Sequence, residues 1–182
     1  MDRQLIDLIP EFNLIQDKEL KNRSLKVWER SIKEGGWQVS DLPDIPFTLL
    51  LEDCDIDIIT HTRAVTRLSK FVAELFDELY PGKLDLNMDY LIAGALLHDA
   101  GKLLEYTRED GKVVKSELGK LHRHPFIGGS IAREEGLPSE VIHMIYAHSR
   151  EGDLGKRIPE AIIVHHADFM NFDPLKSVFK HV

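Results

Sequence analysis

Apolar residues recur at helical spacing along most of the chain, a pattern typical of packed amphipathic helices. Over 60–80 they form a single stripe, made of Val65, Leu68, Val72, Leu75 and Leu79. A second helix is predicted over 90–97, and Asn87 or Asp89 can cap its start. Since 90–97 is apolar on all sides, we expect this helix at the centre of the fold.

Proline and glycine mark the ends of three further predicted helices, at 125–135, 138–149 and 159–170, with Pro174 beyond the last. The segment 103–116 has an Asp110-Gly111 turn signal between two short runs, which predicts a loop or a small hairpin. Strand patterning is otherwise almost absent. The chain is therefore expected to form an all-α domain over 54–175.

Residues 1–53 have a different organisation. Helical patterns over 3–15 and 19–34 are followed by Gly35-Gly36 and by a stretch with two prolines, which is typical of a linker or strap. We interpret 1–53 as an N-terminal helical extension and linker. This extension is free to pack either on the main domain or on a partner.

Composition and charge narrow the class of protein. With 182 residues, 43% hydrophobic and 30% charged, the chain can bury a core of its own. Its net charge of −8 argues against DNA as a partner. Cys54 is the single cysteine, which excludes an internal disulfide and a cysteine-cluster zinc site. With no signal-like or membrane-length apolar run, we expect a cytoplasmic protein that is not membrane-bound, and the sequence leaves room for a homo-oligomer.

Ionisable residues occupy positions that the helical patterns turn inward or that lie at helix ends near the predicted core. They are His61, His98, Asp99, His124, His148 and Asp168. Taken singly, each is explained more simply as a hydrogen-bonded structural residue. Burying such groups without partners costs several kcal/mol, on the order of 2–7 for a neutral group, and a metal ion would satisfy all of them at once. Jointly they favour a metal site.

This ordered set resembles the HD-domain superfamily of metal-dependent phosphohydrolases over about 54–172. The run 96–102, Leu-Leu-His-Asp-Ala-Gly-Lys, looks like the family signature, and His124-Pro125-x-x-Gly128 looks like the extra histidine of its two-metal branches. The resemblance implies a compact HD-domain helical bundle. It also implies a first metal held by His61, His98, Asp99 and Asp168, and a second held with His124 and His148, with Asp99 bridging the two.

The segment 103–124 is also similar to the HD domain of bacterial 3′-5′ exoribonucleases. The sequence indicates no separate nucleic-acid-binding domain of the kind those enzymes carry, so RNA stays open as a substrate. The Gly-Tyr-Pro element of the cyclic dinucleotide phosphodiesterases is missing.

The ligand types indicate which ions and helper groups to expect. Imidazoles combined with carboxylates suit one or two ions of Fe, Mn, Co, Ni or Zn better than Mg or Ca. Lys102 is either a point charge for phosphate oxygens or a surface lysine, so we take Asp99 and Lys102 as the candidate catalytic pair. His165 either orients Asp168 or is a core histidine, and no role is assigned to His122, His166 and His181.

These observations favour a hydrolase of phosphate esters or anhydrides that acts on a nucleotide or a similar small phosphorylated molecule. None of the five Gly-Lys pairs has the context of a P-loop, which excludes a P-loop ATPase. Two alternatives stay open: a non-catalytic HD-like regulatory or docking module, and a di-iron oxygenase on the same scaffold. The Gly101-Lys102 context favours phosphate.

Overall fold

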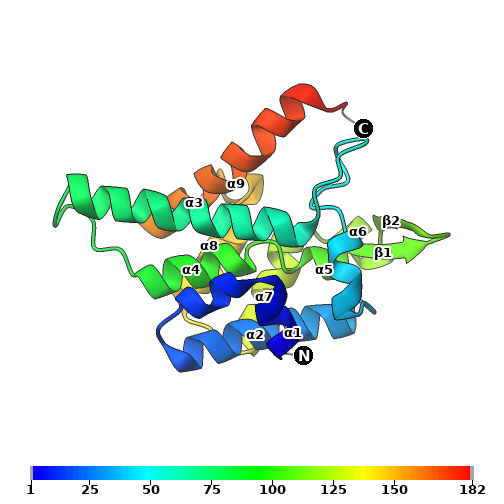
Figure 1. Cartoon of the computed structure of the whole chain (residues 1–182), viewed down its shortest axis with the longest axis horizontal. Coiled ribbons are helices and arrows are strands. Elements are labelled where there is room, and N and C mark those ends of the chain that lie inside the picture. Colours follow the sequence, from blue (N-terminus) through cyan, green and yellow to red (C-terminus); the bar gives the residue numbers. More distant parts are fainter. Residues whose placement is uncertain (1, 181–182) are drawn as a thin grey trace.

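The computed structural model describes residues 2–180, and the regular elements of this part are helices apart from one small hairpin, as the sequence predicts (Figure 1). In chain order the helices and strands are α1 (Asp2–Leu8), α2 (Lys18–Glu34), α3 (Ile58–Leu79), α4 (Met88–Leu97), α5 (Lys102–Glu105), β1 (Tyr106–Glu109), β2 (Lys112–Lys115), α6 (Glu117–Leu121), α7 (His124–Glu134), α8 (Ser139–Ala147) and α9 (Pro159–Val178). Short 3-10 helices lie at Pro10–Leu14, Val39–Asp44 and Arg150–Gly152.

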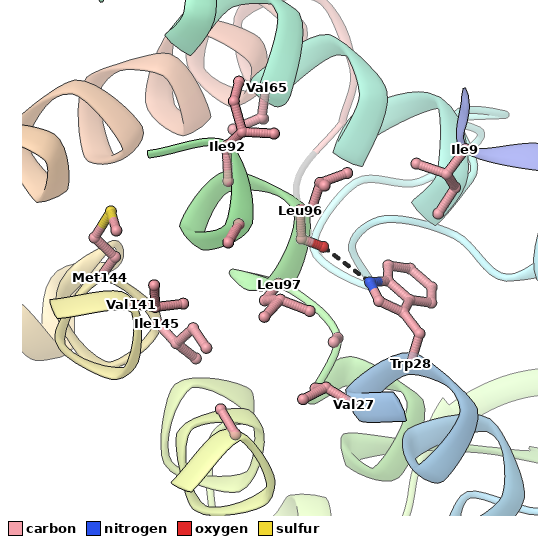
Figure 2. Close-up of a cluster of buried hydrophobic side chains, with 14 of the residues drawn as sticks. Ile9, Val27, Trp28, Val65, Ile92, Leu96, Leu97, Val141, Met144 and Ile145 are labelled. Carbon is pink, nitrogen blue, oxygen red and sulfur yellow. Dashed lines mark hydrogen bonds between the residues drawn. The ribbon is translucent and has the colours of Figure 1, made fainter. Parts of the chain in front are cut away.

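Helix α4 lies at the centre, as its uniformly apolar sequence predicts. It packs against α2, α3, α8 and α9, and its residues from Leu91 to Leu97 are all buried. Figure 2 shows Ile92 of α4 beside Val65 of α3, and the backbone carbonyl of Leu96 directed toward Trp28 of α2. The Trp28 indole N–H of α2 donates to the Leu96 carbonyl at 2.9 Å, so a carbonyl near the end of α4 has a buried partner.

The N-terminal extension packs on the main bundle. Leu5, Ile9 and Phe12 belong to the same buried apolar core as α4, and the Trp37 indole N–H donates to the Leu103 carbonyl at 2.7 Å. The sequence left open whether the extension packs on the main domain or on a partner. The structure shows that it packs on the main domain. The division into 1–53 and 54–175 stays a prediction, since one core is continuous across that boundary.

Two predicted helix boundaries are wrong, and proline is involved in both. The helix predicted over 3–15 is broken, because Pro10 has no N–H for the Ile6 carbonyl, and a 3-10 helix follows α1. By contrast Pro174 lies inside α9, which continues to Val178. The proline is tolerated there because the carbonyl it leaves free belongs to Met170, an exposed residue that water can reach.

The last residues of the extension and those leading to α3 form an ordered loop, called the strap below and defined as residues 45–57. Its ends are joined, because the Ile58 N–H donates to the Ile45 carbonyl at 2.8 Å and the Phe47 N–H to the Ile56 carbonyl at 3.1 Å. The Glu52 N–H at its tip donates to the Lys180 carbonyl at 2.9 Å. Figure 1 shows the strap, in cyan, reaching the C-terminal end of α9.

Of the two conformations predicted for 103–116, the structure has the hairpin. Strands β1 and β2 are antiparallel, with Tyr106 opposite Lys115 and Glu109 opposite Lys112. Asp110 and Gly111 both have positive φ, which matches the two-residue turn that their sequence predicts. Within 2–180, no helix is long and apolar enough to cross a membrane.

Candidate metal centre

The six predicted ligands come from five helices and meet at one place. His98 and Asp99 follow α4 directly, so the most buried helix delivers them to the centre of the fold. His61 lies in the first turn of α3, which Asp57 caps by accepting from two backbone N–H groups at 2.8 Å. The others come from later elements: His124 begins α7, His148 follows α8, and Asp168 lies on α9.

Asp99 lies between two groups of histidines. Its Oδ2 is 3.4 Å from His61 Nε2 and 3.3 Å from His98 Nε2, and we call these three residues the first triad. Its Oδ1 is 3.2 Å from His124 Nε2 and 3.8 Å from His148 Nε2, and these three form the second triad. One carboxylate therefore presents a separate oxygen to each pair of imidazoles.

Asp168 extends the first triad. Its Oδ1 lies 3.1 Å from His61 Nε2 and 4.0 Å from His98 Nε2. The Asp168 side chain is 16% exposed, whereas the Asp99 side chain is 1% exposed. The Asp168 side of the first triad is thus the more accessible one.

Backbone and carboxylate acceptors orient three of the imidazoles. The Nδ1 atoms of His98 and His148 donate to the carbonyls of Ala95 at 2.6 Å and Ile145 at 2.8 Å, each three residues earlier. With the proton on Nδ1, the Nε2 lone pair points into the cluster, which is the arrangement found in histidines that bind metals. Glu105 does the same for His124, as described below.

The donor set fits transition-metal ions. His61 and His98 face each other through their Nε2 atoms at 3.3 Å, and so do His124 and His148. When both facing nitrogens of a pair carry lone pairs, they repel each other, and a cation between them removes the repulsion. Mixed nitrogen and oxygen donors in a buried site are typical of Fe, Mn, Co, Ni or Zn.

The ionisation states of Asp99 and His148 also suit cation binding. Burial opposes the charge of Asp99, but the positive charge of Lys102, together with the neighbouring His98, outweighs it and holds the pKa of Asp99 well below its usual range. Burial, with the neighbouring His98 and His124, lowers the pKa of His148 to about 3. At neutral pH the shared carboxylate is therefore ionised and the His148 imidazole is neutral, as metal ligands must be.

Lys102 is not a surface lysine. It is 8% exposed, and its Nζ donates to Asp99 Oδ2 at 2.6 Å and to the Phe47 carbonyl at 2.5 Å. Burial opposes its charge, but the carboxylate of Asp99 raises the pKa of Lys102 above its ordinary value. Lys102 therefore stays protonated, in direct contact with the proposed bridging ligand.

His165 has a different partner from the one predicted. Its Nδ1 contacts the carbonyl oxygen of His148 at 2.6 Å, and among the described residues it makes no hydrogen bond to Asp168. It therefore steadies the backbone of a histidine in the second triad. Of the residues assigned no role, His122 and His166 are exposed, and His181 lies outside the described residues.

Glu105 is a site residue that sequence reasoning missed. Its Oε2 accepts from both the backbone N–H and the Nδ1 of His124, each at 2.7 Å. The hydrogen bond from His124 outweighs the effect of burial and lowers the pKa of Glu105. One feature of the sequence could have identified it: Glu105 is the single acid among the apolar residues Leu103, Leu104 and Tyr106.

The glycine of the signature run allows two helices to meet at the centre. A Cβ on Gly101 would lie 2.2 Å from the carbonyl oxygen of His124 and 2.6 Å from the backbone nitrogen of Gly128. Any side chain at this position would push α7 away. The absence of a Cβ therefore brings His124 within reach of Asp99.

A cavity of about 330 Å³ opens onto the centre. Its inner wall includes Asp99, Lys102, His124 and Asp168. Four further cationic side chains line it: Lys115, Arg123, Arg150 and Lys176. A small anionic molecule can therefore reach Asp99, His124 and Asp168 through a cavity lined by several positive charges.

Comparison with known proteins finds several curated relatives of this chain. The chain is 36% identical over 115 residues, 61% of its length, to a dihydroneopterin 2′,3′-cyclic phosphate phosphodiesterase of Methanocaldococcus jannaschii, covering 44% of that protein. It is 32% identical over 135 residues, 66% of its length, to the 3′-5′ exoribonuclease YhaM of Listeria innocua, covering 41%. It is 26% identical over 165 residues, 85% of its length, to ribonuclease Y of Pseudothermotoga lettingae, covering 28%.

The chain thus spans less than half the length of each of these curated relatives. No solved structure gives a significant match. The model of the HD domain family matches residues 58–170, which include all six predicted ligands and Lys102. This protein belongs to the HD domain family.

Proposed function

We propose that this protein is a metal-dependent phosphohydrolase that cleaves a phosphate ester or anhydride of a nucleotide or a similar small phosphorylated molecule. The observation that carries the proposal is the position of Asp99, with one carboxylate oxygen toward each pair of histidines. A buried acid shared in this way serves two adjacent cations. The ion pair with Lys102 alone would satisfy a purely structural acid, so the four histidines around Asp99 call for another explanation.

The proposed ligands divide between two ions. His61, His98, Asp99 and Asp168 would hold the first, and Asp99, His124 and His148 the second. When bound, such ions supply an activated water and charge that stabilises the phosphoryl group during its transfer. The native ion is taken to be one of Fe, Mn, Co, Ni or Zn.

The chain's own groups prepare the site for an anionic substrate. Lys102 keeps Asp99 ionised and adds a fixed positive charge at the cavity wall. Glu105 keeps the His124 proton on Nδ1, so that Nε2 faces the centre. We propose Asp99 and Lys102 as the catalytic pair, with Asp99 as the shared ligand and Lys102 offsetting charge on the phosphate oxygens.

The charges around the cavity favour a phosphohydrolase over the two alternatives, a docking module and a di-iron oxygenase. A docking module does not require five cationic groups, Lys102 included, around a buried acid, and an oxygenase acting on a neutral substrate does not require them either. The names of the relatives describe one phosphodiesterase and two ribonucleases. Both considerations favour hydrolysis of a phosphate ester. We place the activity in the cytoplasm, without a membrane or DNA partner.

A hydrolysis panel tests this proposal. Protein loaded with Mn²⁺, Fe²⁺ or Zn²⁺ should release product from at least one of several nucleoside monophosphates, nucleoside 2′,3′-cyclic phosphates or a short RNA. The activity should disappear with a chelator and return with the ion. The variant His122→Ala, altered at an exposed histidine, should keep it. Loaded protein that turns over none of these substrates would contradict the proposal.

A further inference from the structure

Part of the cavity wall comes from outside the region that matches the HD family. The match covers 58–170 and contains all the proposed metal ligands. The strap adds Phe47, Thr48, Leu49 and Leu50 to the lining, and the end of α9 adds Phe172 and Lys176. The matched region therefore supplies the centre, and the flanking segments supply much of what a substrate would touch beyond the reacting phosphate.

One end of the cavity is aromatic. The Phe47 ring lies 4.6 Å from the His61 ring, which places it beside the first triad. Phe172 meets Phe47 edge to face at 6.2 Å, and Phe169 packs against His165 at 4.7 Å. Phe169 and Phe172 are half-buried lining residues, so their rings are partly available to a ligand.

The other end is basic. Arg123 and Lys115 lie beside Glu105, with Arg123 Nε at 3.6 Å and Lys115 Nζ at 3.8 Å from its Oε1. Glu105 is hydrogen bonded to His124, which places this cationic group next to the second triad. Arg123 Nε also lies 3.5 Å from Glu151 Oε1. Both basic side chains are exposed and neither is held by a hydrogen bond of normal length, so they remain able to pair with an anion.

The aromatic end is fixed in place. The Phe47 carbonyl is bonded to Lys102, which in turn is bonded to Asp99. The tip of the strap is hydrogen bonded to the end of α9, the helix that carries Phe172. A wall held at both ends is preformed, and binding to it loses little conformational entropy.

From this arrangement we infer that Phe172, with Phe169 beside it, is the platform on which a planar ring of the substrate stacks. The phosphate then reaches the triads, and the basic end receives any further negative charge. This inference rests on the proposed function. It names the planar ring as the part of the substrate that the site recognises. A cavity of about 330 Å³ is at the small end of ligand pockets, which fits one ring with its sugar phosphate.

Calorimetry with two probes that differ only in the ring tests the inference. Adenosine 5′-monophosphate and ribose 5-phosphate share the sugar and the phosphate. On Mn²⁺-loaded wild type, the nucleotide should bind about tenfold more tightly, as expected for one stacked base. Phe172→Ala should remove most of this difference and leave the affinity for ribose 5-phosphate unchanged. Phe172→Tyr, which keeps the aromatic face, should restore the difference.

Phe71→Ala is the matched control, since Phe71 is a 60% exposed phenylalanine on α3 that does not line this cavity. It should bind both probes like wild type. Equal affinities for the two probes in wild type, no binding of either, or an equal loss of both in Phe172→Ala would overturn the inference. Tighter binding of a six-nucleotide RNA than of the mononucleotide would also overturn it, in favour of a polymer substrate.

The outcome can be separated from the fate of the proposed function. Hydrolysis on the same preparation without a preference for the ring would overturn the inference alone. A preference for the ring without hydrolysis of any phosphate ester would leave the platform in place and contradict the phosphohydrolase.

Discussion

At the scale of single residues, the site depends on buried charges that compensate one another. The Asp99 carboxylate contacts Lys102 through the same oxygen that faces the first triad, while the buried Glu105 carboxylate accepts two hydrogen bonds from His124. Each of these groups would be costly to bury alone. Changes to the supporting residues should therefore be visible both in stability and in metal retention.

Lys102→Ala should destabilise the metal-free protein by about 3 kcal/mol, because it leaves the buried Asp99 charge without its partner. Added Mn²⁺ should reduce that loss, since a cation replaces the missing charge. Urea unfolding with and without the ion measures both values. The exposed Arg67→Ala should change stability by no more than about 0.5 kcal/mol. An equal loss in both conditions would show that Lys102 does not act through the charge of Asp99.

Glu105→Gln should weaken retention of the second ion about 10- to 100-fold, because a neutral amide holds the His124 imidazole less firmly than a carboxylate does. The first ion, bound by residues that Glu105 does not contact, should be retained. Competition with a chelator, followed by analysis of the metal left on the protein, distinguishes loss of the second ion alone from loss of both. Glu109→Gln, an exposed change on β1, is the control. Loss of both ions or of neither would contradict a role confined to the second triad.

At the scale of elements, α4 determines where the site lies, and α2 supports its end. Trp28→Phe keeps most of the apolar ring but leaves the buried Leu96 carbonyl without its donor. We expect a loss of about 2 kcal/mol in the free energy of unfolding, the cost of one unsatisfied buried polar group. Chemical denaturation measures it, with Phe126→Leu on the exposed face of α7 as a control. An unchanged midpoint for Trp28→Phe would show that this contact contributes little.

How much of the structure could be predicted also differs by element. The apolar run of α4 followed by His98 and Asp99 marks the centre of the fold and of the site, because the chain changes from apolar to ionisable within one residue while it stays buried. Local patterns also predict the hairpin turn at Asp110-Gly111. By contrast, Glu105 and Phe47 act through contacts with residues distant in the sequence, at His124 and Lys102, which no local pattern encodes. Pro174 within α9 depends on solvent exposure in the folded state.

At the scale of the whole molecule, one apolar core joins the N-terminal extension to the HD region. Above it, the strap and the end of α9 close over the centre and form the outer wall of the cavity. The region that matches the family model contains all the proposed metal ligands. We expect the flanking segments to determine which substrate binds. On this account the extension is part of the catalytic unit, both as support for α4 and as one side of the substrate site.

Metal content per chain tests the central claim most directly. Mass spectrometry of the purified, metal-loaded protein should find two transition-metal ions in the wild type and in His122→Ala. It should find none in Asp99→Ala, provided that circular dichroism shows the helices intact, because Asp99 is the one ligand common to both triads. A folded Asp99→Ala protein that still held two ions, or a fully helical wild type that bound none, would contradict the account.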